Sequence, residues 1–358
     1  MNYLAKYISR PFWSALFYTL FNKNRSILPI VVLILVSACK KNEVLDELGS
    51  KTDDAGSKTI QLTVPKGFPY PEIPLDNLPT QNRIDLGKKL FFDPILSRDS
   101  TISCASCHHT DKFFTDNQKL SKGIDGRLGK RNATSLINVA YLTDIFWDGG
   151  VPNLEQQVLA PIEDHTEMDF DANKVVERLK KHSNYSILFQ KAYQQEPTIF
   201  ALTRAIACYE RTLIGGTSRF DRFLNENDSS ALSESEIRGH NLFLSEDGEC
   251  FHCHVGFNFT DNSFRNNGLY RTYPDSGRAR ITMDDADIGK FKVPSLRNIT
   301  KTAPYMHDGS LATLDQVLDH YISGGKRHPN RSPIIKPLPL NLKQKQDIIN
   351  FLSSLTDE

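Results

Sequence analysis

Two copies of the pattern Cys-x-x-Cys-His constrain this chain more than any other feature of its sequence. They comprise Cys104, Cys107 and His108 in the first copy and Cys250, Cys253 and His254 in the second. The pattern is the attachment signature of c-type haem, because two thiols at this spacing reach the two vinyl groups of one porphyrin. The histidine that follows can bind the iron as its proximal ligand. The sequence therefore predicts two covalently bound haem c groups.

Zinc binding or disulfide formation would account for less of this cysteine pattern. A zinc site would need four thiolates to converge across a gap of 142 residues, and it would leave both histidines without a role. Two disulfides, or a thioredoxin-like redox pair, would not require a histidine at the fifth position twice. Six cysteines in 358 residues are too few for a disulfide scaffold. The separate Cys208 lies in a helical pattern, which predicts a buried free thiol.

The N-terminus has the character of an export signal. Residues 1–38 contain four basic residues and no acidic residue, and residues 27–38 form an apolar run of 12. Such a run is too short to span a bilayer and is typical of a signal peptide. Small residues precede Cys39, so the segment resembles a bacterial lipoprotein signal, which implies that Cys39 is lipidated. A plain signal peptide and a short membrane anchor remain alternatives, and every version exports the rest of the chain, which predicts a periplasmic protein.

The segment after the signal is polar. Residues 39–60 contain few aromatic side chains, which favours a flexible tether. Without residues 1–38 the chain has 39 basic and 43 acidic residues, a net charge of −4. This charge gives no argument for a nucleic-acid partner.

The chain repeats itself around the two haem motifs. Residues 87–91 match 239–243, and the sequence Phe-Thr-Asp-Asn occurs at 114–117 and again at 259–262. Further on the match is gapless at an offset of 160, so that Asn138 corresponds to Asn298 and Asp148 to Asp308. We therefore predict two copies of one haem domain, at residues 61–220 and 221–358.

The fold class that follows is mostly α, with two tandem cytochrome c-like haem domains and long loops. Small domains of this kind wrap a few helices around the porphyrin, which supplies much of the core. The apolar patterns predict helices at 81–91, 153–160, 171–182, 200–213, 233–244, 313–322 and 341–355.

The two copies differ where chemistry would differ. Trp147 corresponds to His307, and Gln157 corresponds to Val317. After Pro161 the copies diverge, and the first gains acidic and basic residues between 163 and 167. This divergence suggests one catalytic haem and one electron-transfer haem.

Several motifs together resemble the bacterial di-haem cytochrome c peroxidase family, which includes the MauG-type enzymes. The matching segments are 103–108, 114–117, 131–141, 146–168, 210–213, 291–298 and 302–310. The resemblance implies that the N-terminal haem is the peroxidatic one. It also implies that Glu167 handles protons, that Gln157 orients peroxide and that Trp147 lies between the haems.

The resemblance further implies a calcium ion between the domains. Its ligands map to the Asn132 side chain and to the carbonyl groups of Thr302 and Pro304. Oxygen ligands of this kind suit a hard cation.

Two departures from the family pattern change the expected chemistry. In the prototypical peroxidases a histidine caps the resting N-terminal haem, but here Ile124 stands at that place and no histidine lies between His109 and His165. We therefore predict an open distal position on the first haem, ready without reductive activation. At the second haem, the position of the family's distal methionine is held by Tyr321, as in MauG-type enzymes, with Met306 as the alternative ligand. His307, His320 and His328 have no predicted metal role.

The leading hypothesis is a membrane-tethered peroxidase that reduces hydrogen peroxide with electrons from a small donor protein, a cytochrome c or a cupredoxin. One alternative is a MauG-like oxidant of a protein or organic substrate, which the tyrosine and the missing histidine favour. Another is a di-haem electron carrier without catalysis. A homodimer is a candidate assembly.

Overall fold

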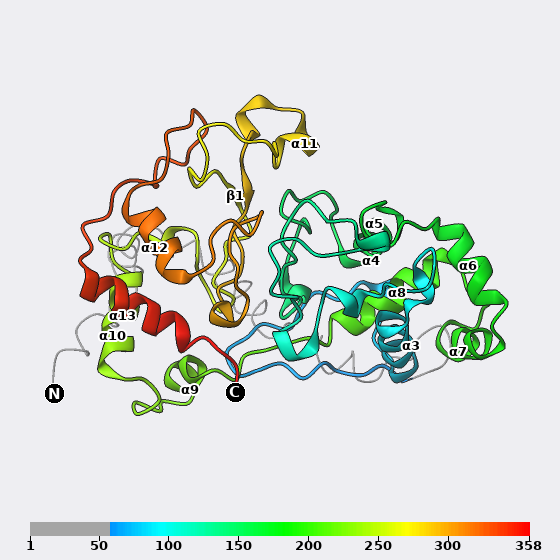
Figure 1. Ribbon diagram of the computed structural model, residues 1–358. Coiled ribbons are helices and arrows are strands. Elements are labelled where there is room, and N and C mark those ends of the chain that lie inside the picture. The colour runs from blue at the N-terminus through cyan, green and yellow to red at the C-terminus, as the bar shows by residue number, and fades with distance from the viewer. Residues whose placement is uncertain (1–57) are drawn as a thin grey trace, which may run out of the picture. The chain divides into compact units, whose positions relative to one another are not determined.

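The computed structural model describes residues 58–358, so the predicted signal peptide, Cys39 and nearly all of the tether lie outside the described residues. The described part is mostly helical, as predicted (Figure 1). Its main helices are α3 Gln81–Phe92, α4 Leu154–Gln157, α5 Leu159–Glu163, α6 Ala172–Lys180, α7 Ser183–Tyr193, α8 Ile199–Glu210, α9 Arg219–Asn225, α10 Glu234–Phe243, α11 Ala279–Thr282, α12 Leu314–Ile322 and α13 Leu342–Ser353. Strands β1 Phe264–Arg265 and β2 Phe291–Lys292 pair antiparallel. No helix within residues 58–358 has the length and hydropathy to cross a membrane.

Each repeat is built on a pair of closely packed helices, α3 with α8 and α10 with α13 (Figure 1). A Cβ atom on Gly87 of α3 would lie 1.8 Å from the carbonyl oxygen of Ala205. A Cβ atom on Gly239 of α10 would lie 1.9 Å from the carbonyl oxygen of Asp347. Any side chain would separate the helices, so the repeated glycine has the same physical reason in both copies.

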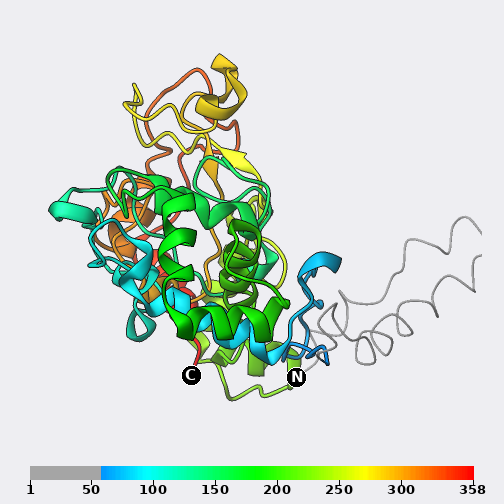
Figure 2. The same cartoon turned by 90° about the vertical axis from the view of Figure 1, so that its right-hand side faces the viewer.

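Each helix pair belongs to a separate hydrophobic core. The first core includes Leu90, Phe91 and Leu202, and the second includes Phe243 and Phe351, all nearly inaccessible to solvent. Helix α6 packs beside α8 and helix α7 beside α3, on the side of the molecule that faces the viewer in Figure 2. Two tandem domains agree with the sequence analysis, whereas the boundary at residues 220/221 stays a prediction.

The long loops of the two copies also follow one design. Asn138 and Asn298 both adopt left-handed backbone conformations, with φ of 63° and 59°. The Asn138 Oδ1 atom accepts a hydrogen bond from the amide of Gly215 at 3.0 Å, and the Asn298 Oδ1 atom accepts one from the amide of Asp357 at 2.8 Å. Asparagine tolerates this conformation better than most residues. The offset of 160 therefore extends from the sequence to the backbone.

The predicted helices occur, with two differences. The run at 153–160 is divided into α4 and α5, because Pro161 has no amide hydrogen to donate to the carbonyl of Gln157. The helices α7, α9 and α11 were not predicted. In α7 the buried residues Tyr185, Phe189 and Ala192 share one face, which is a signal that the sequence analysis passed over.

Candidate functional site

The two Cys-x-x-Cys-His segments adopt the same tight turn. The amide of His108 donates to the carbonyl of Cys104 at 3.0 Å, and the amide of His254 donates to the carbonyl of Cys250 at 3.0 Å. All four motif thiols are free of disulfides. Among residues 58–358 these cysteines form no metal-binding cluster. The geometry therefore supports neither two disulfides nor a four-cysteine zinc site.

The motif thiols also lack the electrostatics of a redox pair. Burial raises the pKa of Cys107 to about 11 and that of Cys250 to about 12. Reactive Cys-x-x-Cys pairs instead have lowered thiol pKa values, because the thiolate is the nucleophile. These thiols fit covalent attachment to a porphyrin better than thiol–disulfide exchange.

Both proximal histidines are oriented by a carbonyl group from the repeated Phe-Thr-Asp-Asn segment. The His108 Nδ1 atom lies 2.8 Å from the carbonyl oxygen of Phe114, and the His254 Nδ1 atom lies 2.9 Å from that of Phe259. These two phenylalanines adopt left-handed conformations, with φ of 57° and 51°, which are strained for a bulky residue. The carbonyl group holds the proton on Nδ1, which leaves Nε2 for iron.

Glu167 is held by its backbone on the loop after α5. Its amide donates to the carbonyl of Asp164 at 3.0 Å, and its own carbonyl accepts from the amide of Ile124 at 2.7 Å. A Cβ atom on Gly123 would lie 2.6 Å from the Glu167 Cα atom, so only glycine allows this approach. Ile124 itself is 0% exposed. The residue that replaces the family's capping histidine is therefore part of the packing beneath Glu167.

The Glu167 carboxyl group lies near the first haem motif. Burial raises its pKa to about 7, and the neighbouring charge of Asp164 adds to this shift. The pKa values of Cys104 and Cys107 are raised mainly by burial, and the Glu167 charge raises both further. Glu167 as a whole residue is nevertheless exposed to solvent. A carboxyl group with a pKa near neutrality can both accept and donate protons.

Trp147 and Gln157 lie close together in the sequence. Trp147 comes before the loop that leads into α4, and Gln157 is the last residue of α4. Gln157 is half-buried and ends α4. The Trp147 Nε1 atom donates to the carbonyl of Asn132 at 2.9 Å, and the Trp147 carbonyl accepts from the amide of Lys292 at 2.8 Å. Trp147 also packs against a small cluster that contains Phe291. These contacts fix the indole between the two repeats.

The three residues predicted to bind calcium belong to the same interface. Asn132 is 8% exposed, and its side-chain amide donates to the carbonyl of Gln118 at 2.8 Å, which leaves Oδ1 for another partner. Asn117 Nδ2 donates to the carbonyls of Lys301 and Ala303. Among residues 58–358, no donor bonds to the neighbouring carbonyls of Thr302 and Pro304. This set of free oxygen atoms fits a hard cation.

The structure brings both candidate distal ligands of the second haem to one amide group. The Asn267 Nδ2 atom lies 3.4 Å from the Tyr321 hydroxyl group and 3.3 Å from the Met306 sulfur atom. Burial raises the pKa of Tyr321 to about 12, Asn267 lowers it, and the charges of Cys253 and Cys250 raise it. Tyr321 therefore lies near the second haem motif. The choice between Tyr321 and Met306 stays a prediction.

Sequence analysis missed Asn267 and a buried ionic network between the repeats. Asp148 is 0% exposed and binds Arg131 at 2.6 Å and Arg280 at 2.6 Å. Arg131 also binds Asp275 at 2.6 Å. Asp148 lies in a segment that matches the family, and this match could have marked it as important. Its partners are distant in the sequence and could be found only from the fold.

The remaining predictions concern four residues without a predicted role in binding haem. Cys208 is 1% exposed and free, as predicted. His307 is buried and stacks on Phe291 with ring centroids 3.6 Å apart. His320 Nε2 lies 3.0 Å from the carbonyl oxygen of Asn267, and His328 Nδ1 accepts from the amide of Asn330 at 3.0 Å.

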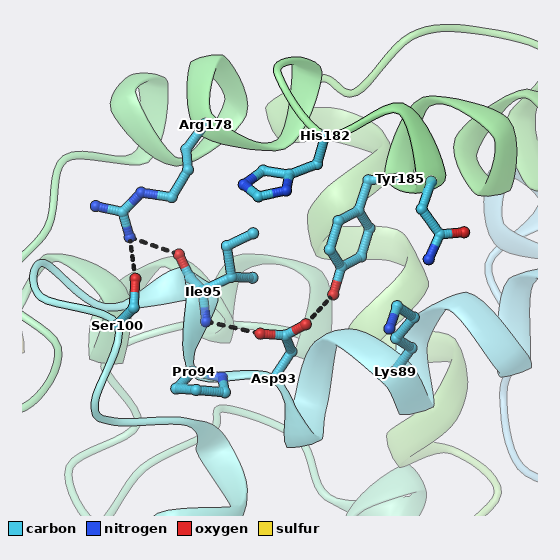
Figure 3. Close-up of a pocket in the computed structure, with 9 residues that line it drawn as sticks. Lys89, Asp93, Pro94, Ile95, Ser100, Arg178, His182 and Tyr185 are labelled. Atoms are coloured by element: carbon cyan, nitrogen blue, oxygen red, sulfur yellow. Dashed lines mark hydrogen bonds between the residues drawn. The ribbon is translucent and has the colours of Figure 1, made fainter.

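One surface pocket lies apart from the predicted site residues (Figure 3). It has a volume of about 400 Å³ and lies between α3, α6 and α7. Its polar groups already bind one another: Tyr185 donates to Asp93 at 2.6 Å, and Arg178 donates to the carbonyl of Ile95 at 2.7 Å. A cluster of Glu246, Glu249 and His252 lies beside the second haem motif, where Lys336 already neutralises Glu249.

Comparisons with known proteins agree with this geometry. A family model described as di-haem cytochrome c peroxidase matches residues 81–229. The chain is 36% identical over 349 residues to a methylamine utilization protein MauG of Methylorubrum extorquens, which covers 93% of this chain and 97% of that protein. It is 37% identical over 282 residues to a cytochrome c551 peroxidase of Nitrosomonas europaea, which covers 76% of this chain and 80% of that one.

One solved structure has the same fold as this chain. It is the crystal structure of a MauG-like protein associated with microbial copper homeostasis. The TM-score is 0.78 at 34% identity, and the match covers 82% of this chain and 95% of that chain. Relatives named as peroxidases and relatives named as MauG are therefore about equally similar to this chain.

Proposed function

Because the chain belongs to the di-haem cytochrome c peroxidase family, it is an oxidoreductase that carries two haem c groups, and we propose that it reduces hydrogen peroxide to water. The reaction consumes one peroxide, two protons and two electrons and yields two water molecules. A small donor protein, a cytochrome c or a cupredoxin, supplies the electrons. When bound, the haem irons supply the redox chemistry.

The residues around the first motif divide the remaining work. His108 and the thiols of Cys104 and Cys107 hold the first haem. Glu167 takes the proton from one peroxide oxygen and delivers it to the other, since its pKa of about 7 allows both steps at neutral pH. Gln157 orients the peroxide through its amide group. Two further protons come from solvent.

The second domain receives electrons and passes them on. His254, Cys250 and Cys253 would hold the second haem, and Tyr321 would offer it a phenolate oxygen. A phenolate oxygen stabilises ferric iron and lowers the reduction potential. Trp147 carries electrons between the domains, since its indole is fixed at both its nitrogen and its backbone carbonyl.

The remaining features complete the proposal. Calcium binds Asn132 Oδ1 and the carbonyls of Thr302 and Pro304, which stiffens the interface between the domains. The domains extend over residues 61–220 and 221–358. The protein is exported to the periplasm and tethered to a membrane by lipid on Cys39.

The observation that carries this proposal is the Glu167 carboxyl group, held beside the first haem motif with a pKa near neutrality. The test is steady-state consumption of peroxide by the holoprotein with reduced cytochrome c or a reduced cupredoxin as donor. Sustained oxidation of the donor, two equivalents for each peroxide, supports a peroxidase. Two haems that never react with peroxide would instead indicate an electron carrier.

A MauG-like oxidant is the second candidate function. It is favoured by the contact between Asn267 and the Tyr321 hydroxyl and by the replacement of the capping histidine with buried Ile124. In this case the holoprotein reacts with peroxide, but neither small donor protein sustains turnover. Electrons would come from a protein or organic substrate, identified by its oxidation when it is mixed with peroxide and holoprotein.

A further inference from the structure

The interface between the two repeats has reciprocal hydrogen bonds. The amide of Asn132 donates to the carbonyl of His307 at 2.8 Å. At the positions 160 residues away, the amide of Lys292 donates to the carbonyl of Trp147, also at 2.8 Å. Reciprocal contacts of this kind are the mark of a two-fold interface, here formed within one chain.

The asparagines of the two Phe-Thr-Asp-Asn segments extend this reciprocity. Asn117 Nδ2 donates to the carbonyl of Lys301 at 2.8 Å. Asn262 Nδ2 approaches the carbonyl of Tyr141 at 3.5 Å, and Tyr141 is the counterpart of Lys301 at the same offset of 160. The interface therefore has two related halves, which can be compared residue by residue.

One difference between the two halves is a change of charge at positions 132 and 292. In the first half, the side-chain oxygen of Asn132 and the carbonyls of Thr302 and Pro304 accept no hydrogen bond from residues 58–358. In the second half, the counterpart of Asn132 is Lys292, which is 7% exposed. One half thus lacks a positive charge among its carbonyl groups, and the other half has one built in.

The Lys292 ammonium group is bound as a cation would be. Its Nζ atom donates to the carbonyl of Thr143 at 2.6 Å and to that of Asn262 at 3.3 Å. Thr143 is the counterpart of Ala303, which lies between the two proposed calcium ligands, and Asn262 is the counterpart of Asn117. The Nζ atom also lies 4.6 Å from the centroid of the Phe264 ring, a cation–π contact.

We infer that Lys292 fills the second of two symmetry-related cation positions with its own ammonium group, whereas the first position takes an external calcium ion. Lys292 then fixes the loop from Thr143 to Trp147 from both ends, through its ammonium group and its amide. It is a positioning residue for Trp147. For the half that contains Asn132, the inference rests on the proposed function, which includes a bound calcium ion. For the half that contains Lys292, it rests on hydrogen bonds within the chain.

The surrounding charges agree with this assignment. Burial lowers the pKa of Lys292 to about 8, which still leaves the group mostly charged at pH 7. The negative charges of Asp144 and Asp261 oppose this shift, and Arg278 adds to it. Asp144 is the counterpart of Pro304, so the second half also contains a carboxylate that the first half lacks. An asparagine at position 292 would therefore leave two carbonyl groups and a carboxylate for a dication.

The test exchanges the residue types at positions 132 and 292 and measures the number of calcium ions bound per chain. Holoprotein treated with a chelator is titrated with calcium chloride by calorimetry. The wild type should bind one calcium ion per chain, Lys292→Asn should bind two, and Asn132→Lys should bind none. The control is Lys290→Asn, two residues before Lys292, which removes the ion pair between Lys290 and Asp287. This variant should still bind one calcium ion. A Lys292→Asn protein that folds and binds no additional calcium would overturn the inference.

A second readout separates this inference from the calcium proposal. If the wild type binds no calcium, the calcium proposal fails, and the rate of electron transfer between the haems decides the role of Lys292. Lys292→Met should slow this transfer between about tenfold and a hundredfold, as a displaced group does, and Lys290→Met should not. Equal rates in the two variants would contradict the positioning role. In Lys292→Asn, added calcium should restore the rate.

Discussion

The two haem domains share one scaffold and differ on one side of it. Both contain a glycine at the crossing of two helices and a proximal histidine bound to a phenylalanine carbonyl. Outside this shared part, the first domain has Glu167 and Gln157, whereas the second has Tyr321 beside Asn267. The repeat therefore preserves what attaches a haem and changes what can react at it.

The carboxyl group of Glu167 is the largest chemical difference between the domains. Replacing it in Glu167→Gln removes the proton acceptor while keeping the size of the side chain. We expect peroxide turnover to fall by about 10²- to 10⁴-fold, the usual contribution of general acid–base catalysis. Turnover is measured with reduced cytochrome c as donor.

The matched control is Glu163→Gln, which changes an exposed carboxyl group at the end of α5. Its turnover should equal that of the wild type. An unchanged rate in Glu167→Gln would remove Glu167 from the proposed chemistry, and equal losses in both variants would point to a general effect of charge.

The shared scaffold predicts equal sensitivity at the two helix crossings. Gly87→Ala and Gly239→Ala each place a methyl group less than 2 Å from a backbone oxygen, so the helices must separate. We expect each change to lower the free energy of unfolding by about 1–3 kcal/mol. Chemical denaturation of the holoprotein measures both.

Gly129→Ala is the control, because its new Cβ atom would lie 3.7 Å from the nearest oxygen. Its unfolding free energy should stay within about 0.5 kcal/mol of the wild type. A large loss at only one of the two crossings would show that the domains do not share the same packing.

The distal side of the second haem offers a choice between two ligands. If Tyr321 is the ligand, Tyr321→Phe should raise the reduction potential of the second haem by a part of the roughly 0.8 V range that axial ligands command. Met306→Leu should leave it unchanged. Potentiometric titration followed by visible spectroscopy measures both, and the reverse outcome would assign the sulfur atom of Met306.

The raised pKa of Glu167 predicts a pH dependence in the first domain. The carboxyl group must be ionised to accept a proton from peroxide, and its pKa is about 7. The value of kcat/KM should therefore fall below pH 7, by about tenfold for each further pH unit. The rate of electron entry into the second domain should not follow this curve. A peroxide rate that is flat between pH 5 and 8 would contradict the role of Glu167.

Much of the site could be predicted from local spacing. The haem motifs and the repeat follow from short segments that need no knowledge of the fold, whereas the role of Glu167 is implied only by the resemblance to the family. The partners of these residues could not, since they come from distant segments: Lys292 meets Thr143, and Asn267 meets Tyr321. The helix break before α5 could have been predicted, because Pro161 is visible in the sequence.

We propose that the first haem is open to peroxide in the protein as isolated. Ile124, at the position of the capping histidine, is fully buried and offers no ligand. Stopped-flow spectroscopy of the as-isolated ferric holoprotein, mixed with peroxide without prior reduction, tests the claim directly. We expect a high-spin ferric signal that disappears at once on mixing. Two low-spin, six-coordinate haems that react only after one electron has been added would contradict it.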